Sequence, residues 1–130
     1  MAQKAVLNPQ AMVDQFKRSG VTHVVFLLDS ETNWMYQLLD SEPSLYLIPV
    51  CLEGESIAIA AGLLAGGKKP VVLIQNTGLF ESGDSIRGVA LDMSLPIVML
   101  VGYRGLTRHG ITSDSSATNI MASTARYVID

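Results

Sequence analysis

Four short apolar runs constrain the fold of this 130-residue chain more than any other feature of its sequence. They are rich in Val, Ile and Leu, and helix-like segments separate them: His23–Leu28, Leu45–Val50, Pro70–Ile74 and Pro96–Val101. Continuous apolar runs of strand length predict parallel strands buried on both faces, because a strand with one face in water alternates with polar residues. Right-handed crossovers through the intervening helices then give a doubly wound α/β fold, with a mainly parallel sheet flanked by helices.

The segments between the runs carry helix signals. Asn8 followed by Pro9 predicts a capped helix start, and Gly20 predicts the end of that helix. Gln75–Gly78 is expected to form the loop beyond the third strand.

The length of the chain suits a single domain over residues 1–130. Further helices are expected at Trp34–Leu39, Glu55–Leu64 and Ser85–Met93.

The composition argues against several function classes. The net charge is −3 and no run of Lys or Arg occurs, so the sequence predicts no nucleic-acid partner. The apolar runs are too short to span a membrane, and the first residues lack the apolar core of a signal peptide. The one cysteine, Cys51, cannot form an intrachain disulfide and is expected to be a small buried hydrophobe. These features predict a cytoplasmic protein without a membrane partner.

Polar or glycine residues follow each of the four predicted strands. In doubly wound sheets, ligands bind beyond the carboxyl ends of the strands, so these residues are expected to build one composite site. No phosphate-binding glycine loop and no cluster with metal-ligand spacing occurs, so no metal ligand is predicted in this chain. The candidates are Asp29 and Ser30 after the first run, Glu53 after the second, Gln75, Asn76, Thr77 and Gly78 after the third, and Arg104 and His109 after the fourth.

Three motifs in order carry a family resemblance. Glu53–Gly62 has the pattern E-G-E-x-I-x-I-A-A-G, Gly67–Pro70 leads into a strand that ends in Gln75–Leu79, and a later strand ends in Gly102–Gly105. The segment that holds them resembles the pyrimidine-binding domain of thiamine-diphosphate-dependent decarboxylases, and within that family the sulfopyruvate and phosphonopyruvate decarboxylases. The resemblance covers residues 8–105, whereas residues 111–130 depart from the family pattern.

The resemblance implies a thiamine-diphosphate-binding fold and a role for each candidate. Glu53 is expected to hydrogen-bond the pyrimidine ring of the cofactor and so activate it, which requires a carboxyl group in a largely apolar pocket. Residues 75–78 are expected to lie against the pyrimidine or the substrate. Asp29 and Ser30 are expected to face the substrate, a small anionic 2-oxo acid. Arg104 and His109 are further substrate candidates from their own chemistry, because an Arg side chain suits such anions and a His side chain can assist proton transfer. Sulfopyruvate would give sulfoacetaldehyde and CO2.

One family feature is absent from the sequence. The resemblance implies a Gly-Asp-Gly motif that holds the cofactor's diphosphate through Mg²⁺, and Ser82–Ser85 (SGDS) does not match it. The resemblance therefore implies a beta subunit that holds the diphosphate and Mg²⁺, with the cofactor shared at the interface. A homo-oligomer is also expected, because a core-rich chain of this size would otherwise expose apolar surface.

Each candidate residue has a simpler structural interpretation. Glu53 could be a first-turn acid favoured by the helix dipole, although Glu55 suits that role better. Asn76 or Thr77 could cap a turn, and for Asp29 and Ser30 the helix-cap interpretation is slightly favoured. Arg104 and His109 could belong to a solvated surface loop, which is the favoured interpretation for His109.

The whole chain also has rival interpretations. It could be a non-catalytic or degenerate α/β binding or regulatory module, or a shortened chain that self-associates without function. A phosphoacceptor receiver domain fits poorly, because the third run ends in Gln75-Asn76 and no lysine follows Gly102.

Overall fold

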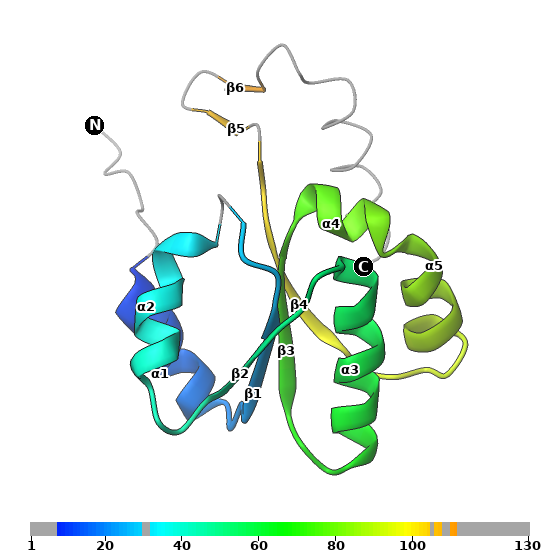
Figure 1. Cartoon of the computed structure of the whole chain (residues 1–130), viewed down its shortest axis with the longest axis horizontal. Helices are drawn as coiled ribbons and strands as arrows, with labels where there is room; N and C mark the ends of the chain where they lie inside the picture. The colour runs from blue at the N-terminus through cyan, green and yellow to red at the C-terminus, as the bar shows by residue number, and fades with distance from the viewer. Residues whose placement is uncertain (1–7, 30–31, 105, 108–109, 112–130) are drawn as a thin grey trace.

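The structure, a computed structural model, describes residues 8–29, 32–104, 106–107 and 110–111. Its centre is a four-stranded, all-parallel sheet in the order β2-β1-β3-β4 (Figure 1). The parallel sheet confirms the predicted α/β fold. The parallel strands are β1 (His23–Phe26), β2 (Tyr46–Pro49), β3 (Pro70–Gln75) and β4 (Val98–Gly102); β5 (Leu106–Thr107) and β6 (Gly110–Ile111) form a separate antiparallel pair.

Burial differs sharply between the inner and outer strands of this sheet. β1 and β3 are almost wholly buried, as continuous apolar runs predict. The expectation of burial on both faces is wrong for β2 and β4, where Tyr46 is 67% exposed and Val98 is 57% exposed. Each of these strands has only one strand neighbour within the described sheet, so less of its surface is covered.

Helices cover both faces of the sheet, as Figure 1 shows. Successive side chains of a strand point to opposite faces, so Val24 and Phe26 of β1 enter one core and Val25 enters the other. The first core includes α1 and α2, and the second includes α3 and the helices that follow β3. The helices are α1 (Pro9–Arg18), α2 (Asn33–Ser41), α3 (Glu53–Ala65), α4 (Asn76–Glu81), α5 (Gly83–Ser85) and a π-helical turn, η1 (Ile86–Leu91).

The ends of α1 follow the sequence signals. Asn8 Oδ1 accepts hydrogen bonds from the backbone N–H groups of Gln10 (2.9 Å) and Ala11 (3.3 Å), which confirms the predicted cap. Gly20 follows α1 with φ +72°, a left-handed conformation that other residues rarely adopt. The Asn8 cap and the left-handed Gly20 therefore set the two ends of α1.

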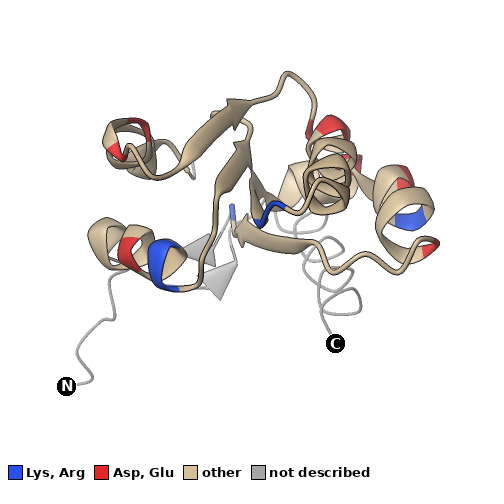
Figure 2. Ribbon diagram, turned by 90° about the horizontal axis from the view of Figure 1, so that it is seen from below, with Lys and Arg blue, Asp and Glu red and all other residues tan. Residues whose placement is uncertain are grey.

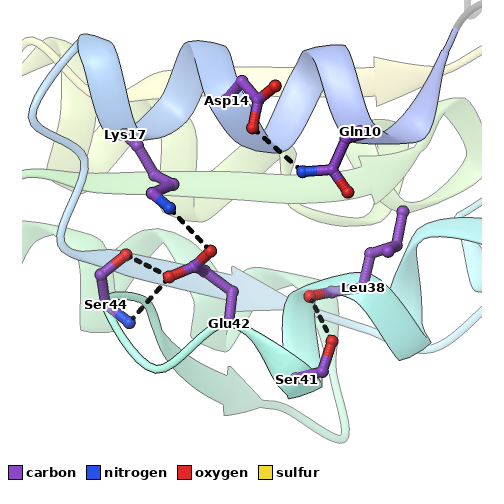
Figure 3. Close-up of polar contacts among 7 residues, drawn as sticks. All are labelled: Gln10, Asp14, Lys17, Leu38, Ser41, Glu42 and Ser44. Atoms are coloured by element: carbon purple, nitrogen blue, oxygen red, sulfur yellow. Dashed lines mark hydrogen bonds and ion pairs between the residues drawn. The ribbon is translucent and has the colours of Figure 1, made fainter.

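A polar cluster joins α1 to the connection between α2 and β2 (Figure 3). Lys17 Nζ lies 2.9 Å from Glu42 Oε2, and the Ser44 hydroxyl donates to Glu42 Oε1 at 2.6 Å. The Ser44 backbone N–H donates to the same oxygen at 3.1 Å. The pKa of the Glu42 carboxyl is held at about 2, first by the Ser44 hydroxyl and then by the Lys17 hydrogen bond.

Three predictions about the segments between the strands need correction. Gln75–Gly78 is not a loop, because α4 begins at Asn76. Glycine has a low helix propensity, so the sequence favoured a loop where contacts with α3 stabilise a helix. The helix predicted over Glu55–Leu64 begins at Glu53, and the one predicted over Ser85–Met93 is divided between α5 and η1.

Charged residues lie on the helices and connections. The strands of the parallel sheet contain no Asp, Glu, Lys or Arg, and in Figure 2 the coloured segments fall outside the strands. No helix in the described part of the chain is long and apolar enough to cross a membrane.

Candidate functional site

The carboxyl ends of the parallel strands bring most predicted site residues to one edge of the sheet. Asp29 follows β1, Glu53 follows β2, Gln75 ends β3 and Arg104 follows β4. This arrangement follows from parallel pairing, since all four strands run in the same direction. Ser30 and His109 lie outside the described residues, and their predicted roles stay predictions.

Glu53 and Gly78 are brought into direct contact. Glu53 is the first residue of α3, and its side chain is half-buried. A Cβ atom placed on Gly78 would lie 2.6 Å from Glu53 Oε1, which is closer than real atoms approach. The Glu53 carboxyl group therefore occupies space that any other residue at position 78 would fill. The absence of a side chain at Gly78 thus permits the close approach of the Glu53 carboxyl group.

Glu55 and Glu53 have different surroundings. Glu55 Oε2 accepts a hydrogen bond of 3.3 Å from the Cys51 backbone N–H, so Glu55 serves the start of α3. Within the described residues, no hydrogen bond or ion pair engages the Glu53 carboxyl group. Glu53 is thus the carboxyl group that remains available to a ligand at this helix start. Cys51 is exposed, so its expected burial is wrong.

Gln75 carries a buried acceptor beside this edge. Its Oε1 atom is buried and has no hydrogen-bond partner among the described residues. Gln75 pairs with Gly102 of β4 in the sheet register, which places it where β3 and β4 end. A buried acceptor without a donor destabilises the folded protein, so this atom marks a position where a ligand donor would be favourable.

The amide of Asn76 ties the ends of β3 and β4 together. Asn76 is 2% exposed, and its Nδ2 donates to the Arg104 carbonyl at 3.1 Å. In return, the Arg104 N–H donates to Asn76 Oδ1 at 3.2 Å, and the Thr77 N–H donates to the same oxygen at 3.1 Å. These bonds favour the structural interpretation of Asn76. A cofactor contact by Asn76 or Thr77 stays a prediction.

Asp29 braces the turn that precedes α2, whose N-cap residue is Thr32. Its Oδ1 atom accepts hydrogen bonds from the Thr32 N–H (2.8 Å) and the Thr32 hydroxyl (3.0 Å), just before α2. The helix-cap interpretation of Asp29 is therefore wrong, because the side chain bonds Thr32 and no N–H group within α2. The substrate role of Asp29 stays a prediction. The Arg104 side chain is exposed, and its predicted role as an anion ligand also remains untested.

The sequence reasoning missed Glu81 and Gly54. Glu81 Oε2 accepts a 2.8 Å hydrogen bond from the Gly54 N–H, and a Cβ on Gly54 would lie 3.1 Å from Ser85 Oγ. One signal was available, because a glycine in the first turn of a helix is less favourable than alanine unless another group approaches closely.

The first turn of α3 is surrounded by negative charge. Glu53 and Glu55 belong to it, and Glu81 reaches it from α4. None of the three forms an ion pair with any residue that the structure describes. The positive end of the α3 dipole offsets part of their repulsion. Over the same residues, no group of three or more His, Cys, Asp or Glu is arranged to hold a metal ion.

A cavity of about 360 Å³ lies on the opposite side of the sheet, where Met12, Trp34 and Met35 face β3 and β4. Neither Glu53 nor Gln75 lines it. Glu53 and the cavity therefore belong to different faces of the molecule.

Comparison with known proteins shows that the chain is similar to sulfopyruvate decarboxylases. The chain is 28% identical over 98 residues to sulfopyruvate decarboxylase subunit alpha of Methanothermobacter thermautotrophicus, and 28% identical over 95 residues to that of Methanococcus maripaludis. These matches cover 75% and 73% of this chain, but only 59% and 57% of the relatives. A sulfopyruvate decarboxylase of Methanosarcina acetivorans is 27% identical over 108 residues, which are 82% of this chain and 27% of that protein.

The chain thus spans less than two thirds of the length of the alpha subunits that it matches. No family model matches it. The similarity to sulfopyruvate decarboxylases confirms the resemblance that the three sequence motifs indicated.

Proposed function

We propose that this chain is the pyrimidine-binding half of a thiamine-diphosphate-dependent 2-oxo acid decarboxylase. The proposed substrate is sulfopyruvate or phosphonopyruvate, and the proposed location is the cytoplasm. The observation that carries the proposal is the half-buried Glu53 carboxyl group, which lies on Gly78 and has no partner among the described residues. The names of the relatives support a decarboxylase subunit.

The Glu53 carboxyl group fits the aminopyrimidine of that cofactor. An aminopyrimidine offers ring nitrogens that accept hydrogen bonds and an amino group that donates them. A protonated Glu53 carboxyl group can donate to a ring nitrogen. Gln75 has the same strand parity as Val71 and Leu73, so its side chain starts from the α1/α2 face and is not assigned to the pyrimidine. Glu53 lies at the carboxyl edge of the sheet, where doubly wound folds bind ligands.

In the proposed mechanism, each residue of this chain has a limited task. Glu53 holds the pyrimidine ring and exchanges a proton through its carboxyl group, which is general acid–base work. Gly78 leaves room for that carboxyl group, and Asn76 keeps the ends of β3 and β4 together. Thiamine diphosphate, when bound, supplies the group that stabilises the carbanion left when a 2-oxo acid loses CO2.

A partner subunit is part of the proposal, because the relatives from Methanothermobacter thermautotrophicus and Methanococcus maripaludis are named alpha subunits. The carboxylates of Glu55 and Glu81 lie at the first turn of α3, and they would repel a diphosphate placed there. We therefore assign the diphosphate and Mg²⁺ to a beta subunit. Self-association of this chain belongs to the same proposal.

The test compares two glutamates of the same helix start. The chain is combined with a thiamine-diphosphate-binding subunit that carries a Gly-Asp-Gly motif, with thiamine diphosphate and with Mg²⁺. Glu53→Gln should keep the fold, because the change is nearly isosteric. It should lower decarboxylation by about 10²–10⁴-fold, as loss of one acid–base group commonly does. Hydrogen–deuterium exchange at the thiazolium carbon should slow with it.

Glu55→Gln is the matched control, because it removes the same charge from the same helical turn. Its rate should stay close to that of the wild type, since Glu55 bonds the Cys51 backbone. The chain alone is the blank and should be inactive. Equal exchange rates in the two variants would remove Glu53 from the mechanism and favour the degenerate-module interpretation.

A further inference from the structure

Helices α3 and α4 exchange glutamate–glycine contacts at their meeting point. Glu53 of α3 lies on Gly78 of α4, and Glu81 of α4 lies on Gly54 of α3. A Cβ on Gly54 would lie 3.6 Å from Glu81 Oε2 and 3.1 Å from Ser85 Oγ. In each helix, a glycine lies in contact with a glutamate of the other helix. These two contacts hold α3 and α4 together beside Glu53.

Glu81 supplies an acceptor that α3 lacks. The first N–H groups of a helix have no partner within the helix, and the N-cap residue Leu52 has no side chain that could accept from them. Glu81 reaches across 27 positions of sequence and accepts from the Gly54 N–H at 2.8 Å. A hydrogen bond to a carboxylate is stronger than one between neutral groups.

This bond acts on the residue next to it. The Gly54 N–H belongs to the peptide plane that begins at the Glu53 carbonyl, so holding the N–H fixes that plane and the Glu53 Cα. Glu81 and Gly78 are three positions apart and therefore share one face of α4. The Ser82 hydroxyl donates to the Gly78 carbonyl at 2.7 Å and strengthens the same turn.

We infer that Glu81 is a positioning residue: its carboxylate holds the Gly54 N–H and thereby fixes the Glu53 carboxyl group on Gly78, ready for the cofactor pyrimidine. This inference rests on the proposed function. Glu81 itself touches neither cofactor nor substrate in this assignment. It acts through the backbone of Glu53.

The experiment uses Glu81→Ala, Glu81→Gln and the control Glu55→Gln in the full chain. The first readout needs no cofactor: the amide hydrogen exchange of Gly54, measured by NMR, should be about tenfold faster in Glu81→Ala. Glu81→Gln keeps an acceptor oxygen and should give an intermediate value. Glu55→Gln should leave the Gly54 amide at its wild-type exchange rate.

The second readout uses the chain with its partner, thiamine diphosphate and Mg²⁺. Glu81→Ala should slow exchange at the thiazolium carbon and lower kcat by roughly 10–100-fold, because a small misplacement of a reacting group can cost about 10²-fold. KM for the 2-oxo acid should change less than about twofold, since Glu81 makes no substrate contact. Glu81→Gln should recover part of the rate.

An unchanged Gly54 amide in Glu81→Ala would overturn the inference, because the hydrogen bond would be absent. A faster Gly54 amide with a wild-type kcat would also overturn it and leave Glu81 as a helix cap only. A wild-type rate in Glu53→Gln is distinguishable from both. It would contradict the proposed function, and with it the positioning role, at any exchange rate of the Gly54 amide.

Discussion

Gly78 is the residue whose replacement tests the site most directly. Alanine is a better helix former than glycine by about 1 kcal/mol, so Gly78→Ala in an undemanding helix would be stabilising. Here the new Cβ would lie 2.6 Å from Glu53 Oε1, and the Glu53 side chain must change rotamer. We expect no gain in thermal stability and a loss of decarboxylase activity of about 10²-fold, measured with the reconstituted enzyme.

Gly62→Ala is the control for that change. Gly62 is exposed within α3, and a Cβ placed there meets nothing within 4 Å. It should raise the free energy of unfolding by roughly 0.5–1 kcal/mol, with wild-type activity. Wild-type activity in Gly78→Ala would show that the contact with Glu53 has no role in the reaction.

The sequence identified single residues of the candidate site better than it identified their contacts. Glu53 and Gly78 were both predicted, from different motifs, but their contact depends on how α4 crosses α3. The hydrogen bond from Gly54 to Glu81 spans 27 positions of sequence, and no local sequence pattern predicts such a bond. The hydrogen bonds of Asn76 to Arg104 span 28 positions and escaped prediction for the same reason.

At the scale of the elements, the parallel sheet was predictable because its inner strands are buried on both faces. β3 is the clearest case, with its first five residues buried. The greater exposure of β2 and β4 was not predictable, because exposure depends on the order of strands in space. The start of α4 was missed since its helix depends on contacts with α3 more than on its own propensity.

The contact between α1 and the α2–β2 connection should make stability depend on pH. The folded pKa of Glu42 is about 2, below its ordinary value of 4.5, so the folded state favours the charged carboxylate. Its contribution is therefore fully present above about pH 4.5 and is lost as the pH falls towards 2. Glu42→Gln should lower Tm at pH 7, and its difference from the wild type should shrink over that range.

Ser44→Ala tests the cause of this shift. The Ser44 hydroxyl makes the largest contribution, so its removal should raise the Glu42 titration midpoint towards 4.5, as followed by carboxyl-carbon NMR. Asp40→Asn is the control, because Asp40 is an exposed carboxyl group near the same helix end. A Tm difference for Glu42→Gln that stays constant from pH 7 to pH 2 would contradict the assignment.

At the scale of the whole molecule, the carboxyl edge combines negative charge with exposed apolar side chains. Leu28 follows β1, Leu52 precedes α3 and Phe80 belongs to α4, and each is at least half exposed. A large exposed apolar surface on a monomer usually marks an interaction site. The proposed occupant of this edge is the diphosphate-binding subunit, because the proposed cofactor must reach both Glu53 and the groups that hold its diphosphate.

Phe80→Ser should therefore weaken binding of that subunit without unfolding the chain. Phe80 is 60% exposed, so its loss leaves the core intact, while burial of a phenylalanine side chain at an interface contributes about 1.5–3 kcal/mol. The dissociation constant, measured by titration calorimetry, should rise roughly 10–100-fold, at about 1.4 kcal/mol for each factor of ten. Val98→Ser is the matched control, because Val98 is 57% exposed but begins β4, at the opposite edge of the sheet. It should bind the partner as the wild type does. If both variants lost affinity equally, or if only Val98→Ser did, the partner would not dock at the carboxyl edge, and Glu53 could not face a cofactor shared between the two subunits.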